Sequence, residues 1–563
     1  MFKRRRTNKV RHTIDPDEIF LDATNLPRFD THQFQGRLEK SISKHTLLFL
    51  GGLFLVVILL FAFKLYLLQV KNGLFYSALA ENNRLQHTPV FPERGVIFDR
   101  NGVALAWNES FKEEREYSKR AYGVEAGLAH VVGYVRYPSQ DSSGFYIKDT
   151  FTGVAGIENF YDEILSGENG LIIVETDALG NIASQSATRP VKNGKNITLA
   201  IDERIQKKLY EEIGSLARTV GFNAGAGVIM DIKTGELIAL TSFPEYDPAI
   251  LTGGSEEVRS FINDEREPFL NRATNGLYTP GSIVKPFVAL AALNEKVIDP
   301  ETKILSTGSL SIPHPYFEDR ESVFTDWKAH GWVSLREALA VSSNVYFYEV
   351  AGGYEEQEGV GIERLEAYFK LLGFGTETGV DLSGEEKGVI PTPSWKKQVF
   401  GDEWRVGDTY NTAIGQYGFQ ITPLQAVRAI SAIANDGALF LPRVVKMIDN
   451  KEVRSLKKNI QYIDKEHYAV VREGMRLAVT SGTAAGLSLP FVDVAAKTGT
   501  AEVGISKKSV NSWVIGFFPY EEPRYAFSVV MEKGPRNNLI GGLFIMRELF
   551  LWMRTETPEY LAI

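Results

Sequence analysis

An uninterrupted apolar run near the N-terminus constrains this chain more than any other feature of its sequence. Residues 46–63 (TLLFLGGLFLVVILLFAF) carry no charged side chain, and apolar residues continue after Lys64 in LYLLQV. A run of this length fits a membrane span, whereas a helix buried in a soluble core usually keeps a polar face. The run follows a tail of about forty residues and lacks a small-residue cleavage site, unlike a cleaved signal peptide. We therefore predict one retained transmembrane helix over residues 46–70.

The charges that precede this run predict its orientation. Basic residues flanking a membrane span stay on the cytoplasmic side, so the N-terminus is expected in the cytoplasm and everything after about Val70 outside it. Residues 1–45 mix charges with Pro, Asn and Gln without apolar periodicity, and we expect a mostly disordered cytoplasmic tail there. The basic residues on which the orientation rests are Lys3, Arg4, Arg5, Arg6, Lys9, Arg11, Lys40 and Lys44.

Length, charge and cysteine content narrow the remaining possibilities. At 563 residues the chain exceeds one ordinary domain, so two or more folded units are expected. A formal net charge of -8 argues against nucleic-acid binding, which needs a basic surface. The chain has no cysteine, which excludes disulfides, thiolate nucleophiles and cysteine-ligated metals. Any chemistry must rest on other side chains.

Strand and helix signals occur in separate blocks after residue 90. Turn residues between β-rich arms predict hairpins, and apolar residues three and four apart predict helices. Strands, then helices, then strands again favour an α+β fold over an alternating parallel one. The predicted elements are hairpins at 92–106 and 226–242, helices at 282–293 and 334–351, and strands at 512–519 and 524–532.

A serine and a lysine three residues apart form the first candidate catalytic motif. Ser282 and Lys285 would share one side of a helix, where an amine can take the proton of a hydroxyl. Pro280 and Gly281 predict a turn before Ser282, and Pro286 is tolerated only where a helix has barely begun. Ser282 is therefore expected at a helix N-terminus, which favours developing negative charge, with Lys285 partly desolvated by apolar neighbours. We interpret the same spacing at Ser41/Lys44, Ser394/Lys397 and Ser455/Lys458 as chance.

Two further motifs follow in order. Ser342-Ser343-Asn344 lies in an apolar helical stretch, where buried polar side chains need partners. Residues 497–500 (Lys-Thr-Gly-Thr) lie among small residues that predict an edge strand, with Gly499 allowing a ligand to approach the backbone closely. We interpret Ser509-Val510-Asn511 as a chance match and Lys233-Thr234-Gly235 as an ordinary hairpin turn. The ordered set of three motifs matches the signature of penicillin-binding proteins.

Over roughly residues 90 to 535 the chain resembles a class B penicillin-binding protein. Segments such as GLYTPGSIVKP, DWK, GVDLSGE and GDTYNTAIGQ are most similar to the elongation-specific branch, penicillin-binding protein 2. The resemblance implies the penicillin-recognising serine transpeptidase fold, an antiparallel sheet flanked by helices, after a small β-rich pedestal. The expected domains are the tail at 1–45, the transmembrane helix at 46–70, a reduced pedestal of the dimerisation type at 71–195 and the transpeptidase domain at 196–563.

The same resemblance implies a mechanism. Ser282 attacks the carbonyl between the last two D-alanines of a peptidoglycan stem peptide, Lys285 is the general base, and an acyl-enzyme forms; β-lactams would acylate the same serine. The remaining roles are proton transfer and substrate positioning by Ser342 and Asn344, completion of the polar network by Lys497, binding of the terminal carboxylate by Thr498 and Thr500, and an oxyanion hole made by the backbone N–H groups of Ser282 and Thr500.

The resemblance also implies the protein's surroundings. It places the chain as a single-pass protein in the bacterial cytoplasmic membrane with an extracytoplasmic catalytic domain. No glycan-polymerising domain is present in the sequence, so a membrane glycosyltransferase of the SEDS family is the expected partner. No cofactor, metal or nucleic acid is expected.

Three departures from the family pattern limit this transfer. Residues 415–418 read Gly-Gln-Tyr-Gly where the family usually has Gly-Gln-Gly-Tyr. Some elongation-type relatives carry a zinc site with a cysteine ligand near the Ser-x-Asn motif, and this chain has no cysteine, although Asp326 and His330 lie in that region. We interpret His330 as structural and Trp327 and Trp332 as packing residues.

The third departure lies between Gly102 and Leu128. Relatives of the elongation type usually insert a head subdomain there, which the resemblance links to an activator protein. Here about thirty residues separate the flanking segments, too few for a hydrophobic core of their own. We expect a pedestal without a head, with residues 112–120 as a solvated linker or short exposed helix.

Other functions remain open at this point. A division-type transpeptidase, a D,D-carboxypeptidase or a penicillin-hydrolysing enzyme would share the fold, although the class B front end argues against the last two. A scaffold or sensor without catalysis is a further alternative, against which Ser282, Lys285 and Lys497 argue.

Overall fold

The computed structural model describes most of the chain after the N-terminal tail. The described residues are 43–76, 85–109, 117–123, 126–142, 146–176, 182–317, 319–504, 508–538 and 540–561. They belong to two compact units, one of residues 1–86 and 176–180, the other of residues 87–175 and 181–563. Of the tail predicted at 1–45, residues 1–42 lie outside the described residues.

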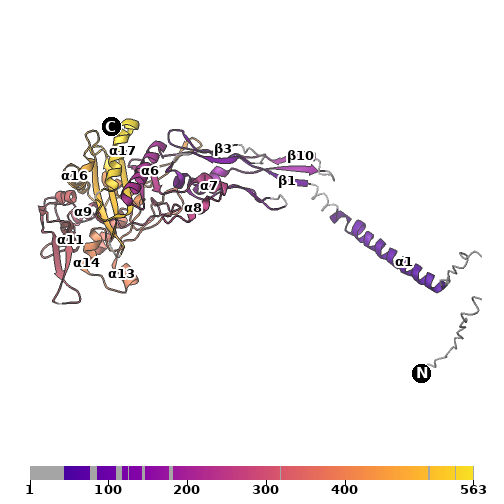
Figure 1. Cartoon of the computed structure of the whole chain (residues 1–563), viewed down its shortest axis with the longest axis horizontal. Helices are drawn as coiled ribbons and strands as arrows, with labels where there is room; N and C mark the ends of the chain where they lie inside the picture. The colour runs from indigo at the N-terminus through magenta and orange to yellow at the C-terminus, as the bar shows by residue number, and fades with distance from the viewer. Residues whose placement is uncertain are drawn as a thin grey trace, which may run out of the picture. The chain divides into compact units, whose positions relative to one another are not determined.

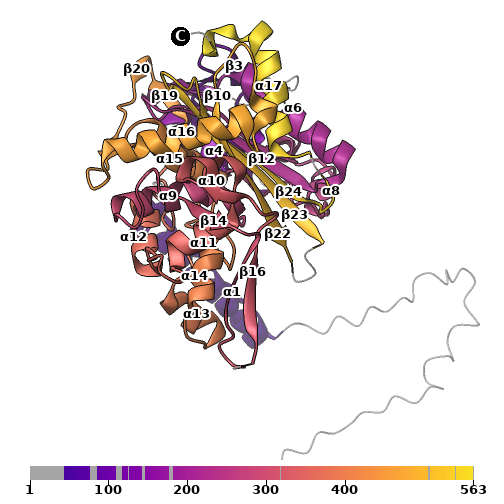
Figure 2. The ribbon, with the colours of Figure 1, turned by 90° about the vertical axis from the view of Figure 1, so that its left-hand side faces the viewer.

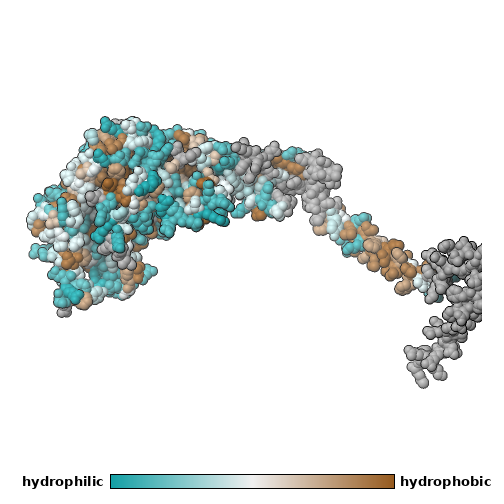
Figure 3. Space-filling view, viewed as in Figure 1, coloured by the Kyte–Doolittle hydropathy of each residue, from teal (hydrophilic) through white to brown (hydrophobic). Residues whose placement is uncertain are grey.

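The first unit contains the predicted membrane segment as one long helix (Figure 1). α1 (Lys44–Tyr66) continues as the π-helical turn η3 (Leu67–Lys71), and no side chain of α1 is buried. Figure 3 shows apolar residues along this helix. Within the described residues it is the one helix long and apolar enough to cross a membrane, and it contains the predicted span of 46–70.

A six-stranded sheet joins the pedestal to later parts of the chain. Its strand order is β20-β19-β11-β2-β3-β4. The predicted hairpin at 92–106 is confirmed: β2 and β3 pair antiparallel, and Asp99 Oδ1 accepts the backbone N–H groups of Asn101 and Val103 in the turn, each at 2.8 Å. The strands are β2 (Ile97–Phe98), β3 (Ala104–Glu109), β4 (Lys119–Tyr122), β11 (Ile197–Leu199), β19 (Val445–Ile448) and β20 (Lys451–Glu452).

The expectation of a linker or helix over residues 112–120 is wrong at its C-terminal end. Lys119 and Arg120 belong to β4, which pairs antiparallel with β3, while residues 110–116 lie outside the described residues. Arg120 is buried, and its Nε atom lies 2.7 Å from Oε1 of Glu158. Arg94 Nε lies 2.6 Å from Oε2 of the same carboxylate. An ion pair between residues 38 positions apart left no local signal in the sequence.

The second unit also contains a five-stranded antiparallel sheet of order β13-β12-β24-β23-β22. The predicted hairpin at 226–242 and the strands at 512–519 and 524–532 are confirmed. Lys233-Thr234-Gly235 is the turn between β12 and β13, as predicted, with the Lys233 N–H donated to Asp231 Oδ1 at 2.8 Å. The strands are β12 (Ala224–Asp231), β13 (Leu237–Phe243), β22 (Ala495–Val503), β23 (Ser509–Phe518) and β24 (Tyr525–Pro535).

Helices cover both faces of this sheet (Figure 2). Phe527, Val529 and Met531 of β24 share a core with α6 (Glu203–Leu216) and α17 (Gly542–Glu556). The alternating residues Ala526 and Val530 share the opposite core with α9 (Lys285–Asn294) and α15 (Pro423–Ala434). Burial on both faces explains why these strands are almost continuously apolar.

The other described elements are helices, single turns and small sheets. The helices are α3 (Ala129–Val132), α4 (Gly156–Phe160), α5 (Asp162–Ser166), α7 (Pro248–Gly253), α8 (Val258–Ile262), α10 (Leu335–Val341), α11 (Asn344–Gly352), α12 (Ile362–Leu371), α13 (Pro393–Phe400), α14 (Val406–Ala413) and α16 (Lys465–Ser481). The 3-10 turns are η5 (Gly281–Val284), η6 (Ala485–Leu487) and η7 (Pro558–Tyr560), and a π-helical turn η4 (Ala217–Gly221) follows α6. The strand pairs are β5 (Val135–Arg136) with β8 (Thr152–Gly153), β6 (Ser139–Gln140) with β7 (Tyr146–Lys148), β14 (Ile304–Ser306) with β17 (Gly331–Val333), β15 (Ser309–Pro313) with β16 (Glu321–Thr325), and β18 (Ala438–Phe440) with β21 (Lys457–Asn459). A three-stranded sheet joins β1 (Leu85–Val90), β9 (Gly170–Thr176) and β10 (Ile182–Arg189).

Candidate active site

The sequence predicts Ser282 in the first turn of an α-helix. The structure places it instead in a 3-10 turn that precedes the helix. η5 spans Gly281–Val284, and α9 begins at Lys285 with Pro286 in its first turn. Ser282 is half-buried, whereas Lys285 is fully buried. The 3-10 turn still sets Ser282 one turn before Lys285, so the spacing that the motif requires is kept.

The turn of Ser282 packs directly on β22, the strand that carries the Lys-Thr-Gly motif. A methyl group at Gly281, which has φ of +59°, would lie 3.0 Å from the carbonyl oxygen of Thr500. One at Gly499 would lie 2.9 Å from the carbonyl oxygen of Pro280. Only glycine allows the two backbones to come this close. β22 is an edge strand, as predicted, so backbone groups on its outer side are free of strand pairing.

The helix predicted at 334–351 is broken at the second motif. α10 ends at Val341, Ser342 has the left-handed values φ +59° and ψ +41°, and α11 begins at Asn344. Ser343 caps α11, since its Oγ atom accepts the N–H of Tyr346 at 3.3 Å. Serine side chains hydrogen-bond nearby backbone groups and so favour such breaks, which apolar periodicity does not reveal.

Both motif lysines converge on this break. Lys285 Nζ donates to the carbonyl oxygen of Ser342 at 2.8 Å and to Asn344 Oδ1 at 2.7 Å, and it lies 3.3 Å from Ser342 Oγ. Lys497 Nζ donates to Ser342 Oγ at 2.8 Å and to the carbonyl oxygen of Thr498 at 2.9 Å. The structure therefore joins Lys285, Ser342, Asn344 and Lys497 in one network, and Lys285 links this network to the turn of Ser282.

The remaining predicted residues line β22. Thr498 is half-buried, and its hydroxyl donates to Thr483 Oγ1 at 2.9 Å; Thr500 is exposed. Sequence reasoning did not find Thr483, which lies between α16 and η6 and belongs to none of the three motifs.

Burial lowers the pKa of both lysines. Desolvation lowers the pKa of Lys285 well below its ordinary value, the nearby charge of Lys497 lowers it further, and Asp326 opposes this shift. Desolvation lowers the pKa of Lys497 to about 7. Within the described residues no carboxylate forms an ion pair with either amine. A neutral amine within reach of a serine hydroxyl can act as a general base near neutral pH.

The chance matches to the motifs lie on other elements. Ser394 and Lys397 belong to α13, where Lys397 pairs with Glu403. Lys458 belongs to the exposed strand β21. Asn511 lies on β23, and its Oδ1 accepts the N–H of Lys533 at 2.9 Å. Ser41 lies outside the described residues.

Trp327 and Trp332 were predicted to be packing residues, and residues 415–418 depart from the family sequence. Trp327 and Trp332 do not enter a core, because the two residues are 58% and 65% exposed, although the ring of Trp327 lies edge-to-face with that of His330 at 5.0 Å. The Nε1–H of Trp327 donates to the carbonyl oxygen of Val341, next to Ser342, at 3.1 Å. In the 415–418 segment Tyr417 has φ of +62°, a conformation that glycine adopts without strain.

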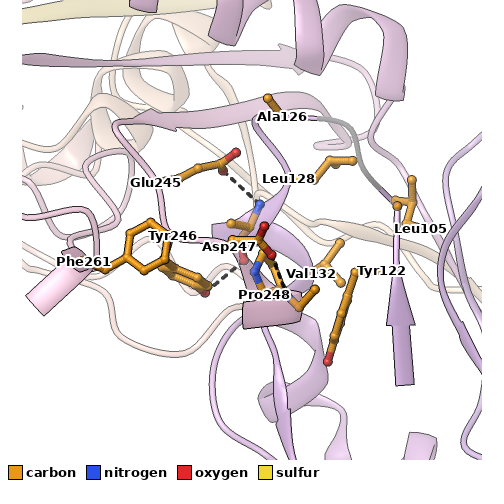
Figure 4. A pocket seen from close by; sticks show the side chains of 13 residues that line it. Leu105, Tyr122, Ala126, Leu128, Val132, Glu245, Tyr246, Asp247, Pro248 and Phe261 are labelled. Carbon is orange, nitrogen blue, oxygen red and sulfur yellow. Dashed lines mark hydrogen bonds between the residues drawn. The ribbon is translucent and has the colours of Figure 1, made fainter. Parts of the chain in front are cut away.

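A separate pocket of about 320 Å³ lies between pedestal and catalytic segments (Figure 4). Leu105 and Tyr122 line one side, and Glu245 and Tyr246 line the other. Glu245 accepts the backbone N–H groups of Gly127 and Ala129, and the Tyr246 hydroxyl donates to the carbonyl oxygen of Ala129 at 3.0 Å. Burial raises the pKa of Glu245 to about 7. This pocket shares no residue with the lysine network.

Comparison with known proteins gives a consistent result. The family model described as the penicillin-binding protein transpeptidase domain matches residues 225–542, and that of the penicillin-binding protein dimerisation domain matches residues 112–199. The peptidoglycan D,D-transpeptidase MrdA of Haemophilus influenzae is 28% identical over 90% of this chain and 91% of the relative. MrdA of Escherichia coli K12 is also 28% identical, over 89% and 92%.

Solved structures agree with this result. PBP2 of Pseudomonas aeruginosa in complex with WCK 5153 is 30% identical, with a TM-score of 0.69 over 84% of this chain and 97% of that one. PBP2 of Helicobacter pylori in complex with MreC is 28% identical, with a TM-score of 0.69 over 84% and 99%.

Proposed function

The chain belongs to the family of penicillin-binding protein transpeptidases, and on this premise we propose that it is a peptidoglycan D,D-transpeptidase of the elongation type. The observation that carries the proposal is the convergence of Lys285 and Lys497 on Ser342, beside the turn that holds Ser282. The elongation type is supported by the similarity to MrdA and PBP2 proteins, one of which was solved with MreC.

In the first half-reaction Ser282 Oγ attacks the carbonyl carbon between the last two D-alanines of a stem peptide. Burial lowers the pKa of Lys285, and in its neutral form the amine takes the hydroxyl proton as the new C–O bond forms. The C–N bond to the terminal D-alanine then breaks, and its amine receives a proton through Ser342 Oγ, which Lys497 and Lys285 connect to the network. The products are free D-alanine and an ester on Ser282.

The oxyanion forms where the turn of Ser282 meets β22. Backbone N–H groups of Ser282 and Thr500 are the donors we assign to it, and each such donor commonly contributes about 3 kcal/mol of transition-state stabilisation. Asn344 orients the peptide, and Thr498 and Thr500 bind the terminal carboxylate. In the second half-reaction the amine of a neighbouring stem peptide attacks the ester, its proton passes to the base, and Ser282 is restored with the cross-link formed. β-Lactams would acylate Ser282 through their ring amide carbonyl.

The proposal includes a location and partners. α1 serves as the single-pass anchor in the bacterial cytoplasmic membrane, with the basic tail in the cytoplasm and the catalytic domain outside. A SEDS-family glycosyltransferase in the same membrane supplies the glycan strands. We place the boundary between pedestal and transpeptidase domain near residue 195, which is supported by family models that cover 112–199 and 225–542.

The test is a cross-linking assay on the full-length protein in detergent. Lipid-linked precursor and a glycan polymerase are supplied, and the digested product is analysed for linked stem peptides. The intact chain is expected to give cross-linked dimers and Ser282→Ala none, while Ser394→Ala and Ser455→Ala behave as the intact chain. Stem peptides that lose D-alanine without dimers would indicate a carboxypeptidase instead.

Fluorescent penicillin separates chemistry from folding. Ser282→Ala is expected to abolish covalent labelling with an unchanged melting temperature, because the substitution removes one oxygen atom only. Covalent labelling that survives in this variant would move the nucleophile to another residue.

A further inference from the structure

A single carboxylate oxygen gathers the backbone and side chains of the Ser342–Asn344 turn. Oδ2 of Asp326, the residue after β16, accepts the backbone N–H of Asn344 at 2.7 Å and that of Val345 at 3.1 Å. The same oxygen accepts the hydroxyls of Ser343 at 2.8 Å and Ser306 at 3.2 Å. The other oxygen, Oδ1, accepts the backbone N–H of Trp327 at 2.8 Å.

The partners of Asp326 are neutral donors. Its side chain is fully buried, and the side chain of His330 is nearly so, but His330 Nε2 lies 3.7 Å from Asp326 Oδ1, beyond hydrogen-bond distance. The two N–H donors of Asn344 and Val345 come from the first turn of α11, where unpaired N–H groups and the helix dipole favour negative charge. A buried carboxylate held this way is stabilised without a cation.

One residue that Asp326 holds, Asn344, is also a partner of Lys285. The same Asn344 whose N–H reaches Asp326 presents its Oδ1 to Lys285, and Ser343 follows the strained residue Ser342. Left-handed backbone at a non-glycine residue costs about 1–3 kcal/mol and persists only where its surroundings determine it. We propose that Asp326 is a positioning residue that fixes the Ser342–Asn344 turn in its catalytic form, and that it does so without a metal ion.

The residues around Asp326 do not fit zinc. Zinc sites take cysteine, histidine or carboxylate ligands, and here the side chains that contact Asp326 Oδ2 are the neutral hydroxyls of Ser306 and Ser343. A cation at Oδ2 would also meet the two N–H groups of Asn344 and Val345, which point their positive ends at it. Within the described residues no group of three His, Cys, Asp or Glu side chains is arranged to hold a metal. The hydrogen-bonded carboxylate therefore does the holding itself.

The test compares penicillin acylation by the full-length protein and by Asp326→Asn, which replaces an acceptor oxygen with an amide that also donates. The inference rests on the proposed function, so acylation of the intact chain is measured first, and its absence would count against that function instead. We expect the acylation rate of Asp326→Asn to fall about a hundredfold, the usual result of misplacing a catalytic group by about 1 Å. Ser306→Ala, which removes one donor, is expected to fall several-fold and keeps the test available if Asp326→Asn folds poorly.

Asp202→Asn is the control. Asp202 is also a buried carboxylate at a helix N-terminus, accepting the N–H of Arg204 at 3.1 Å on α6, on the other side of the sheet. Unlike Asp326 it has a cationic partner, since Arg204 Nη2 lies 2.8 Å from its Oδ2. Its replacement is expected to lower the melting temperature and to leave the acylation rate of folded protein unchanged. Equal effects of Asp202→Asn and Asp326→Asn on acylation would reduce Asp326 to a stabilising role and overturn the inference.

The pH profile of acylation gives a readout that stability does not move. The charged groups acting on Lys285 are Lys497 on β22 and Asp326, with Lys328 and His330 next to Asp326. Asp326 raises the pKa of Lys285, so its neutralisation is expected to shift the acid limb of the profile to lower pH. An unshifted limb together with a normal rate would contradict the proposal.

Metal analysis completes the test. The purified chain is expected to carry less than a tenth of an equivalent of zinc, and its acylation rate is expected to be unchanged after dialysis against a chelator. One equivalent of zinc that is lost in Asp326→Asn, or a rate that falls on chelation and returns with zinc alone, would overturn the metal-free assignment.

Discussion

Two buried charge clusters in this molecule are built in opposite ways. In the pedestal, Arg94 and Arg120 share the carboxylate of Glu158, and Arg94 also reaches Asp162 at 2.7 Å. In the catalytic centre, Lys285 and Lys497 are as deeply buried, but the partners described above are carbonyl, hydroxyl and amide oxygens. The first cluster neutralises its cations and the second leaves them without a counter-ion.

The difference shows in the proton affinities. Although burial opposes it, the neighbouring carboxylates raise the pKa of Arg94, whereas burial lowers that of both lysines. Removing one partner of a buried ion pair leaves the other charge buried without a counter-ion, which lowers the free energy of unfolding. Removing a buried amine that has no counter-ion removes an unfavourable burial of charge, and it also removes the group proposed to act as a base. The pedestal cluster is thus expected to matter for folding and the catalytic cluster for reaction.

The largest effect is expected for Lys285→Met, which keeps the side-chain volume and removes the base. The rate of penicillin acylation should fall by about three orders of magnitude, within the usual range for loss of a general base. The free energy of unfolding should stay the same or rise, because a buried amine without a counter-ion is removed. Stopped-flow acylation and urea unfolding measure the two quantities. A strongly destabilised variant would show that the lysine is compensated after all.

The reverse pattern is expected for Glu158→Gln in the pedestal. The free energy of unfolding should fall by about 3 kcal/mol or more, since buried Arg120 loses its counter-ion and buried Arg94 keeps only Asp162. Acylation per folded molecule should not change. Asp162→Asn is the control, because the side chain of Asp162 is 29% exposed and its loss should cost less. A tenfold slower acylation in folded Glu158→Gln would break the division between the two clusters.

A pH-dependent effect is expected for Lys497→Met. With a folded pKa of about 7 and an ordinary value of 10.5, Lys497 binds its proton more tightly in the unfolded chain. The stability of the intact protein should therefore gain from this group as pH rises from about 7 to 10. Relative to the intact chain, Lys497→Met should be most stable at pH 7 and below, and the difference should shrink toward pH 10. Urea unfolding at several pH values measures it, and a constant difference would mean that Lys497 stays charged.

The smallest effect is expected at the pocket of Figure 4, where the buried group is a carboxylate. Burial raises the pKa of Glu245 to about 7 from 4.5, so the folded state holds its proton more tightly. The stabilising contribution is complete below about pH 4.5 and is lost as pH rises through 7. Glu245→Gln should gain stability relative to the intact chain between pH 5 and 8. Thermal unfolding at matched pH detects this, with the exposed Glu256→Gln as control; a difference independent of pH would show that Glu245 is charged throughout.

Local patterns in the sequence predicted the elements and the motif residues well. The Asn101-Gly102 turn, the hairpin around Lys233 and the edge position of Lys497 each follow from residues that are neighbours in the chain. Context also separated Ser282 from other serines with the same spacing, because Pro280 and Pro286 confine a helix start to that place.

What could not be predicted depends on partners distant in the chain. Asp326 precedes Asn344, whose N–H its carboxylate accepts, by 18 positions. The local sequence Asp326-Trp327-Lys328 does not predict this contact. The break at Ser342 runs against the apolar periodicity that continues on both sides of it. Trp327 and Trp332 were expected to pack, yet the two residues are 58% and 65% exposed.

The close backbone contact between the turn of Ser282 and β22 also limits how this chain can evolve under an antibiotic. A side chain added at Gly281 or Gly499 to obstruct a penicillin would strike the carbonyl oxygen of Thr500 or Pro280 before it reached the drug. On the proposed function, such a change separates Ser282 from β22, the strand that we assign to binding the natural peptide, so a substitution that reduces penicillin binding there also reduces cell-wall synthesis. Heritable resistance is left to exposed side chains outside this contact, such as that of Trp327, which can vary while both backbones stay in place.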